Sequence, residues 1–187
     1  MPDFVVHKQI IKHREVVDDD WSVLRLVEGE TPEGVVVPEG KFIVPLGVWQ
    51  AQRAALSGRA QIGVWLAPDE QAVAIRDDLH RFGVIAVDFP KFSDGRGYSI
   101  AFNLRKRLAY TGELRAIGDV LRDQLWPLSR VGFDAFAPRQ DRSIVDALKG
   151  LTVFSETYQA SSDQPLPLFR RAPRGTPPEL TDIGAGI

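Results

Sequence analysis

The sequence predicts an α/β fold with a mostly parallel sheet of about five strands, crossover helices and an N-terminal β arm. Three observations support this prediction. The chain has 187 residues, 44% of them hydrophobic, which suffices for one domain with a core. Short apolar runs bounded by glycine or proline recur from Leu46 onward. Helical patterns separate these runs at intervals of roughly 25 to 30 residues, as right-handed βαβ crossovers require.

Residues 1–45 read as the antiparallel β arm. The pairs Ile10-Ile11 and Val16-Val17 flank a charged stretch, and 21–26 alternates weakly between apolar and polar residues. Two further apolar runs, 35–37 and 42–44, are separated by a Pro-Glu-Gly turn and are both expected to be strands.

Residues 46–160 form the expected α/β domain. A helix near 48–56 is expected to end at Ser57-Gly58, and a proline at Pro127 is expected to kink or end the helix of 119–126. The other expected helices cover 69–83, a stretch following the loop 90–97, and 144–148. The expected strands are 62–67, 84–89, 113–118, 133–137 and 151–158.

Residues 161–187 are rich in proline and glycine. Such a composition buries little apolar surface, so this tail is expected to be extended or disordered.

Alternation along the strands predicts two unlike faces of the sheet. Ile85 and Val87 share one face of their strand, whereas Ala86 and Asp88 share the other. An open doubly wound sheet, covered by helices on both faces, should be apolar on both. Small and ionisable residues on one face suit a partial (β/α) barrel with helices outside. Both architectures remain open from the sequence.

Composition excludes several classes of function. The chain has no cysteine, so disulfides, thiol catalysis and cysteine-ligated metal centres are excluded. A net charge of −2 provides no global attraction for nucleic acid. No apolar run approaches the length of a bilayer span, and the N-terminus lacks a secretory h-region, so we expect no membrane partner and a cytoplasmic location. A homo-oligomer remains open.

Unusual polar chemistry follows two neighbouring strands of the expected sheet. Ligands of parallel α/β folds bind at the carboxyl ends of strands, where the segments 88–98 and 118–124 are placed. In Asp94-Gly-Arg-Gly97, glycines and a following helix favour a small oxyanion such as phosphate, sulfate or a carboxylate. The candidate anion-binding residues are Lys91, Gly95, Arg96, Gly97, Tyr98 and Arg122. An alternative is that Asp94 caps the helix while Arg96 pairs with Asp88 or Asp119.

Four aspartates provide the remaining candidate site residues. They are expected to orient the arginines or to hold a metal ion such as Mg²⁺. The alternative is a structural ion-pair network with Arg96, Arg115 and Arg122. The four candidates are Asp88, Asp94, Asp119 and Asp123.

Several motifs resemble one bacterial family. The two longest of these motifs are IAVDFPKFSDGRGYSIAFNLR at 85–105 and GELRAIGDVLRDQL at 112–125. The shorter ones are VWQAQR at 48–53, GVWLAPDE at 63–70 and GFDAF at 132–136. These segments resemble domain of unknown function 934, over roughly residues 46–160. That family is commonly encoded beside the haemoprotein sulfite reductase of assimilatory sulfate reduction, and many members carry an oxidoreductase label.

The resemblance implies an accessory protein of sulfate or sulfite reduction, with sulfite reductase as partner. Neither cysteine nor a dinucleotide fingerprint is present, so we expect protein or anion binding without a redox centre of its own. No cofactor is evident, which leaves a flavin or Mg²⁺ open. The alternatives are a metal-assisted enzyme acting on an anionic small molecule, and a scaffold in which the polar residues form a structural network.

Overall fold

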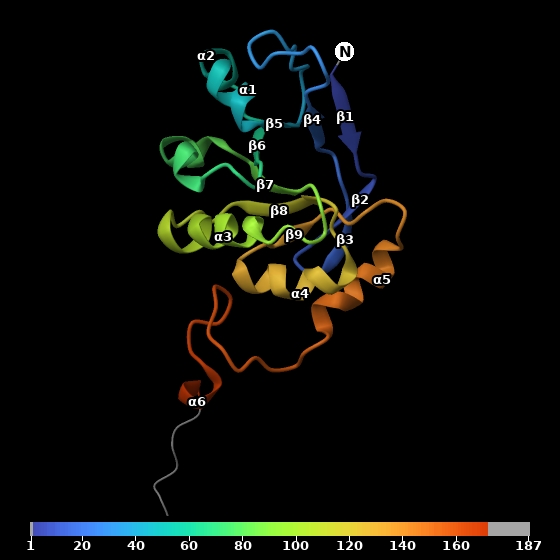
Figure 1. Ribbon diagram of the computed structural model, residues 1–187, viewed down its shortest axis with the longest axis vertical. Helices are drawn as coiled ribbons and strands as arrows, with labels where there is room; N and C mark the ends of the chain where they lie inside the picture. The colour runs from blue at the N-terminus through green and yellow to red at the C-terminus, as the bar shows by residue number, and fades with distance from the viewer. Residues whose placement is uncertain (1, 172–187) are drawn as a thin grey trace, which may run out of the picture.

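The computed structural model describes residues 2–171, which form an α/β structure around one nine-stranded sheet (Figure 1). The strands are β1 (Asp3–Val6), β2 (Gln9–Lys12), β3 (Glu15–Asp18), β4 (Ser22–Arg25), β5 (Phe42–Pro45), β6 (Ile62–Leu66), β7 (Val84–Phe89), β8 (Glu113–Gly118) and β9 (Ala135–Phe136). The helices are α1 (Leu46–Ala51), α2 (Arg53–Leu56), the 3₁₀ helix η1 (Ala72–Arg81), α3 (Arg96–Phe102), the π-helix η2 (Asn103–Arg107), α4 (Arg122–Val131), α5 (Ile144–Leu148), the 3₁₀ helix η3 (Lys149–Thr152) and α6 (Leu168–Arg171).

The sheet is larger than the roughly five strands expected, because residues 1–45 contribute strands to both of its edges. Its order is β1-β4-β5-β6-β7-β8-β9-β2-β3. Strands β4 to β9 pair in parallel, whereas β1, β2 and β3 pair antiparallel with their neighbours. The expected N-terminal arm is therefore part of the same sheet as the parallel strands.

Two expected strands are wrong. Residues 151–158 were expected to form a strand, but Leu151 lies in η3. The far side of β9 is occupied by β2, through the pairing of Ile11 with Phe136. Residues 35–37 are irregular, because side chains bind their carbonyl groups in place of a neighbouring strand. Gln52 donates to the Val35 carbonyl at 2.8 Å, and Arg59 donates to that of residue 37 at 3.0 Å.

The sheet curls until its two edges lie close together. β1 is at one edge and β2 is next to the other, yet only His7 and Lys8 connect them along the chain. Such a link spans at most about 11 Å. Backbone and side-chain hydrogen bonds hold the link, with Asp19 N–H donating to the Lys8 carbonyl at 3.0 Å and Gln140 to the Val6 carbonyl at 2.9 Å.

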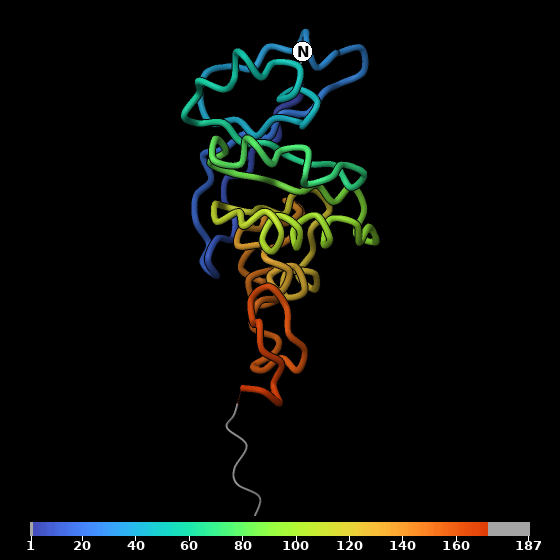
Figure 2. Tube along the Cα trace, turned by 90° about the vertical axis from the view of Figure 1, so that its left-hand side faces the viewer, coloured from blue at the N-terminus to red at the C-terminus, as the bar shows by residue number. Residues whose placement is uncertain are grey.

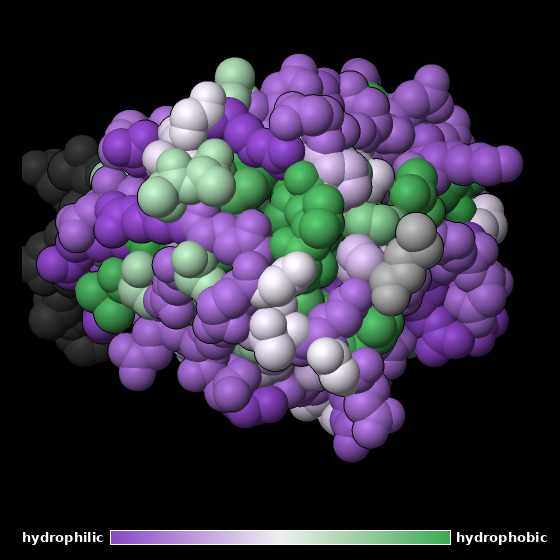
Figure 3. Space-filling view, turned by 90° about the horizontal axis from the view of Figure 1, so that it is seen from above, coloured by the Kyte–Doolittle hydropathy of each residue, from purple (hydrophilic) through white to green (hydrophobic). Residues whose placement is uncertain are grey.

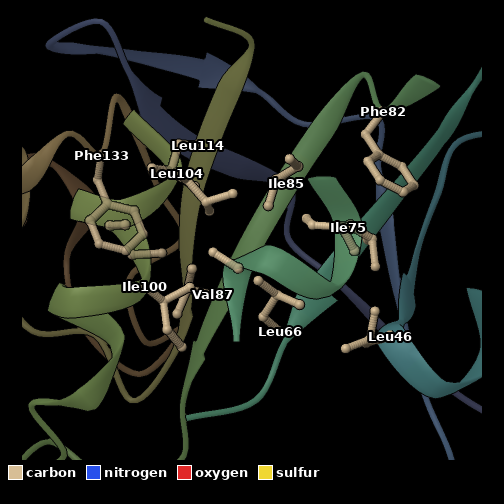
Figure 4. Close-up of a cluster of buried hydrophobic side chains, with 14 of the residues drawn as sticks. Leu46, Leu66, Ile75, Phe82, Ile85, Val87, Ile100, Leu104, Leu114 and Phe133 are labelled. Carbon is tan, nitrogen blue, oxygen red and sulfur yellow. The ribbon is translucent and has the colours of Figure 1, made fainter. Parts of the chain in front are cut away.

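The crossover helices cover only the outer face of this curled sheet. In the larger hydrophobic cluster, Ile85 and Val87 from β7 pack with Ile75 from η1 and Ile100 from α3 (Figure 4). Among the described residues, the cluster on the inner face contains no helical residue and is formed by strands and by Ala137. The fold is therefore a curled, mostly parallel α/β sheet with helices on one face, as a partial (β/α) barrel requires, whereas an open doubly wound sheet has helices on both faces.

The inner face carries the small and ionisable residues that strand alternation predicted. Arg115 is 1% exposed and pairs with Asp19 at 2.8 Å and with Glu113 at 2.7 Å. Lys12 from β2 pairs with the same Glu113 at 2.7 Å. These bonds join β8 to β2 and to the residue after β3, so the network stabilises the curled shape from inside.

The helix after β8 starts later than expected and continues through Pro127. Proline lacks an N–H donor, so it leaves one carbonyl of the preceding turn without its helical partner. That carbonyl belongs to Asp123, an exposed residue of the first turn, where water can replace the bond. Of the two expected effects of Pro127, a kink or a helix end, the helix end is wrong, because α4 continues to Val131.

The chain after η3 runs along α4 and extends away from the sheet (Figure 2). Arg130 of α4 anchors this segment by donating to Asp163 at 2.9 Å and to Thr157 at 3.0 Å. Residues 161–171 of the expected tail therefore include contacts to α4 and the short helix α6. The rest of that tail, 172–187, lies outside the described residues.

The surface at the end of the molecule that carries β1 and α1 is mostly hydrophilic, crossed by a narrow strip of hydrophobic side chains (Figure 3). Val27 and Val36, in the loop between β4 and β5, are exposed. Within residues 2–171, no helix combines the length and apolarity that a bilayer crossing requires.

Candidate functional site

Polar residues gather where the parallel strands end. The neighbouring strands β6, β7 and β8 all point the same way, so the residues that follow them meet at one edge of the sheet. The two expected segments lie there: 88–98 starts in the last two residues of β7, and 118–124 starts at the last residue of β8. This edge is where ligands of (β/α) barrels bind.

Asp88 points to the inner face and is held by an arginine from the N-terminal region. It is 6% exposed and accepts two hydrogen bonds from Arg25, at 2.6 and 3.3 Å. The guanidinium carbon of Arg25 lies 5.0 Å from the centre of the Trp65 ring. A bidentate pair that also stacks on an aromatic ring fixes the arginine firmly.

Asp119 has a separate set of partners. It accepts a hydrogen bond from the Phe92 backbone N–H at 2.8 Å and another from Arg139 at 3.2 Å. Arg139 also binds Asp141 at 2.8 Å, and these hydrogen bonds raise the pKa of Arg139. Ion pairs are thus present at Asp88 and Asp119, but Arg25 and Arg139 form them. The expected network with Arg96, Arg115 and Arg122 at these aspartates is wrong.

Arg115 and Arg122 pair elsewhere in the molecule. Arg115 belongs to the buried inner-face network described above, and Arg122 binds Asp146 of α5 at 3.1 Å on the surface. Among residues 2–171, no group of three or more histidine, aspartate or glutamate side chains is arranged to hold a metal ion. Asp88 and Asp119 share no hydrogen-bond partner.

The loop before α3 is organised by a local ion pair. Asp94 accepts bonds from the Arg96 side chain at 2.7 and 3.0 Å and from the Arg96 backbone N–H at 3.1 Å. These hydrogen bonds, the side-chain ones first, lower the pKa of Asp94. Gly97 is buried, and a Cβ there would lie 2.6 Å from the Phe89 ring, so the absence of a side chain lets α3 pack closely on β7. Gly95 has open space around it.

The other candidates flank this loop. Lys91 is exposed on the loop itself, and Tyr98 of α3 packs edge-on against Phe89 with ring centres 5.9 Å apart. Burial, with a smaller effect from the charge of Asp123, raises the pKa of Tyr98. Arg122 and Asp123 begin α4, where Arg122 binds α5 and does not join Arg96.

A groove on the outer face brings Arg96 together with two arginines that sequence reasoning missed. This outer groove, about 570 Å³, lies between η1 and the continuous helix of α3 and η2. Its polar lining includes Arg76, Arg96, Ser99, Asn103 and Arg107. No hydrogen bond or ion pair to a carboxylate is found for Arg76 or Arg107 within the described part of the chain. Both arginines occupy helix positions of the kind that usually face solvent, so the hydrophobic periodicity of the sequence did not indicate that they line a groove.

A second cavity opens on the inner face at the same edge of the sheet. This inner mouth, about 360 Å³, is formed where β1, β4 and β8 meet the chain after β9. Its charged lining is Arg25, Arg139 and Asp141, and its apolar lining includes Val5 and Ile117. His7 also lines it, and burial lowers the pKa of that histidine.

Comparison with known proteins identifies a family. Residues 63–169 match the model of a family described as bacterial protein of unknown function, DUF934. The chain belongs to this family. The matched region contains β6 to β9, the loop before α3 and all three arginines of the outer groove, whereas His7 and Arg25 of the inner mouth precede it. No curated protein and no solved structure matches the chain.

Proposed function

We propose that this DUF934 protein binds a small oxyanion in the outer groove. The observation that carries the proposal is that Arg76, Arg96 and Arg107 all line the outer groove, and that only Arg96 has a carboxylate partner among the described residues. A guanidinium presents several N–H donors in a planar fork, which suits a tetrahedral or pyramidal oxyanion. Arginines without a carboxylate partner retain that capacity for a ligand.

Neutral polar groups support the same site. Ser99 and Asn103 lie on the α3–η2 side of the outer groove and provide hydroxyl and amide donors between Arg96 and Arg107. Acidic Asp69 and Glu70 line the groove just after β6. Glu70 accepts a hydrogen bond from the Ala67 N–H at 2.7 Å, so one of its oxygens is engaged with the backbone. Repulsion from these carboxylates favours an anion seated toward Arg76 and Arg107.

The resemblance to a family encoded beside sulfite reductase suggests sulfite or sulfate as the anion. The protein would then act in assimilatory sulfate reduction as an accessory that binds the reductase or delivers its substrate. The chain contains no cysteine and no dinucleotide fingerprint, which favours binding over electron transfer by its own centre. Deletion of the gene tests this role: we expect slower growth on sulfate and lower sulfite reductase activity, and wild-type values for both would contradict it.

Calorimetric titration with sulfite, sulfate and phosphate at low ionic strength tests the site itself. We expect Arg76→Gln and Arg107→Gln each to weaken sulfite binding about tenfold, since a charge-assisted hydrogen bond contributes about 1.5–3 kcal/mol. Low ionic strength matters because salt screens exposed charges.

Arg122→Gln is the matched control for that titration. Arg122 is also an exposed arginine, but it binds Asp146 outside the outer groove. Binding equal to that of the unmodified protein is expected for this variant. If Arg122→Gln weakens sulfite binding as much as Arg107→Gln does, the effect is one of net charge and the assigned groove is wrong.

A metal-assisted enzyme centred on Asp88 and Asp119 is the less well supported alternative. Arg25 occupies both oxygens of Asp88, and Asp119 binds a backbone N–H and Arg139. A divalent cation would have to displace these partners. Mg²⁺ binding that is abolished by Asp88→Asn would favour this alternative over the outer groove.

A further inference from the structure

The inner mouth differs in chemistry from the outer groove. Val5, Val23 and Ile117 form an apolar wall, and the cationic groups Arg25 and Arg139 stand at its rim. Small-molecule sites are typically apolar cavities with a few converging polar groups, and a volume of about 360 Å³ is within their usual range. The composition of this cavity therefore suits a ligand with one charged end and an apolar body.

The position of the inner mouth also suits a ligand. It lies on the face of the sheet that the helices leave uncovered, at the carboxyl ends of β4 and β8. The loop after β9 supplies Arg139, and the short link between β1 and β2 supplies His7. Several separate segments thus converge on one cavity, which is how binding sites are built at the mouth of (β/α) barrels.

The two arginines retain donors for a ligand. Arg25 directs two N–H groups at Asp88, although a guanidinium has five. Arg139 is shared between Asp119 and Asp141, and Asp141 is a surface carboxylate with 53% of its side chain exposed. A surface ion pair is weak and exchanges readily with another carboxylate.

We propose that the inner mouth binds a small organic carboxylate with an apolar body, distinct from the oxyanion of the outer groove. The carboxylate binds Arg139 and Arg25 at the rim, and the body packs on Val5, Val23 and Ile117. The two sites lie on opposite faces of the same strands, because Ile117 belongs to the inner cluster and Ile100 of the outer groove to the outer one.

These two isoleucines provide a direct assay. In isoleucine-methyl NMR of the full chain, titration with hexanoate is expected to shift the Ile117 signal and leave the Ile100 signal unchanged. Acetate, which has the head group alone, is expected to bind at least about tenfold more weakly, because each buried CH₂ contributes about 0.8 kcal/mol. The neutral alcohol 1-hexanol should also bind more weakly, since it lacks the charge that Arg139 recognises.

Two pairs of variants locate the ligand. Val5→Phe fills the cavity and should abolish the Ile117 shift, whereas Val6→Phe, on the outward-facing and 52% exposed neighbour, should keep it. Arg139→Gln should weaken hexanoate binding about tenfold, for loss of a charge-assisted bond, while Arg107→Gln should not. If Val5→Phe does not fold, the effect of Arg139→Gln on hexanoate binding tests the site instead.

Clear results would overturn the inference. It is wrong if hexanoate shifts Ile100 and leaves Ile117 unchanged, if acetate or 1-hexanol binds as tightly as hexanoate, or if a folded Val5→Phe protein binds hexanoate normally. Failure of this inference can be distinguished from failure of the proposed oxyanion site, because sulfite binding is expected to depend on Arg107 and not on Arg139.

Discussion

At the scale of single residues, the pair of Arg25 and Asp88 shows how a candidate site residue also stabilises the fold. The carboxylate of Asp88 is 9% exposed, and Arg25 provides its two side-chain hydrogen bonds. Removing one partner of a buried pair leaves a charge without compensation, which costs more than the pair itself contributes. The pair also joins β4 to β7, two strands that are not neighbours in the sheet.

We predict that Arg25→Met destabilises the protein by about 2–3 kcal/mol, less than for a fully buried pair because Arg25 is partly exposed. Methionine keeps the apolar stem against Trp65, so the change reports mainly on the charge. The free energy of unfolding from urea denaturation at pH 7 measures the effect. The double variant Arg25→Met/Asp88→Asn identifies the cause. If it recovers the stability that Arg25→Met loses, the unpaired carboxylate of Asp88 is responsible.

Arg96→Met is predicted to leave the urea midpoint unchanged. The side chain of Arg96 is 61% exposed, and among residues 2–171 its one ion-pair partner is neighbouring Asp94. The scaffold hypothesis requires the opposite, a clear loss of stability. A lower midpoint for Arg96→Met would therefore support the scaffold, whereas weaker sulfite binding at an unchanged midpoint supports the outer groove.

At the scale of elements, the end of β8 depends on a glycine. Gly118 has φ +94°, and a Cβ there would lie 2.5 Å from the Phe89 carbonyl oxygen and 2.7 Å from an oxygen of Asp88. The absent side chain allows the end of β8 to approach β7 and places Asp119 beside the next loop. Local backbone conformation thus decides where two candidate carboxylates stand.

Gly118→Ala is predicted to lower the free energy of unfolding by about 1–3 kcal/mol, through the positive φ and the close contacts. Thermal denaturation followed by circular dichroism measures it. Gly95→Ala is the control, since Gly95 has φ −85° and nothing within 4 Å of the added methyl. Equal losses in the two variants would contradict the explanation from backbone strain and contact.

At the scale of the whole molecule, Asp78 connects three helices that belong to two crossover segments. Buried on η1, it accepts hydrogen bonds from Trp49 of α1 at 3.0 Å and from Arg53 of α2 at 2.7 Å. Burial acts to raise its pKa, but the hydrogen bonds and the charges of Arg53 and Arg81 outweigh it, and the net effect lowers the pKa of Asp78.

The sign of this shift sets a pH dependence of stability. A lowered pKa in the folded state stabilises the protein at pH values above the unfolded-state pKa, and the stabilisation is lost as pH falls through the folded-state pKa. We therefore predict that Asp78→Asn flattens the decline of the urea midpoint below about pH 4, the region of unperturbed aspartate titration. Asp77→Asn, at the exposed neighbouring position, should retain the full decline.

Much of the parallel block could be predicted because it rests on local patterns. The runs at 62–67, 84–89 and 113–118 became β6, β7 and β8, and their alternation correctly placed Asp88 and Arg115 on a polar face. The strand expected at 151–158 failed because short apolar runs do not specify their pairing partner. β2 pairs with β9 from more than 100 residues away, and no local pattern reports such a contact.

The candidate site divides in the same way. The sequence by itself determined that ionisable residues follow β7 and β8, since residue type and strand alternation are local properties. Only the tertiary structure decided their partners: Arg25 for Asp88, Arg139 for Asp119, and Arg76 and Arg107 beside Arg96. Curling of the sheet and packing of η1 against the outer face bring these residues together, and both depend on contacts between segments far apart in the chain.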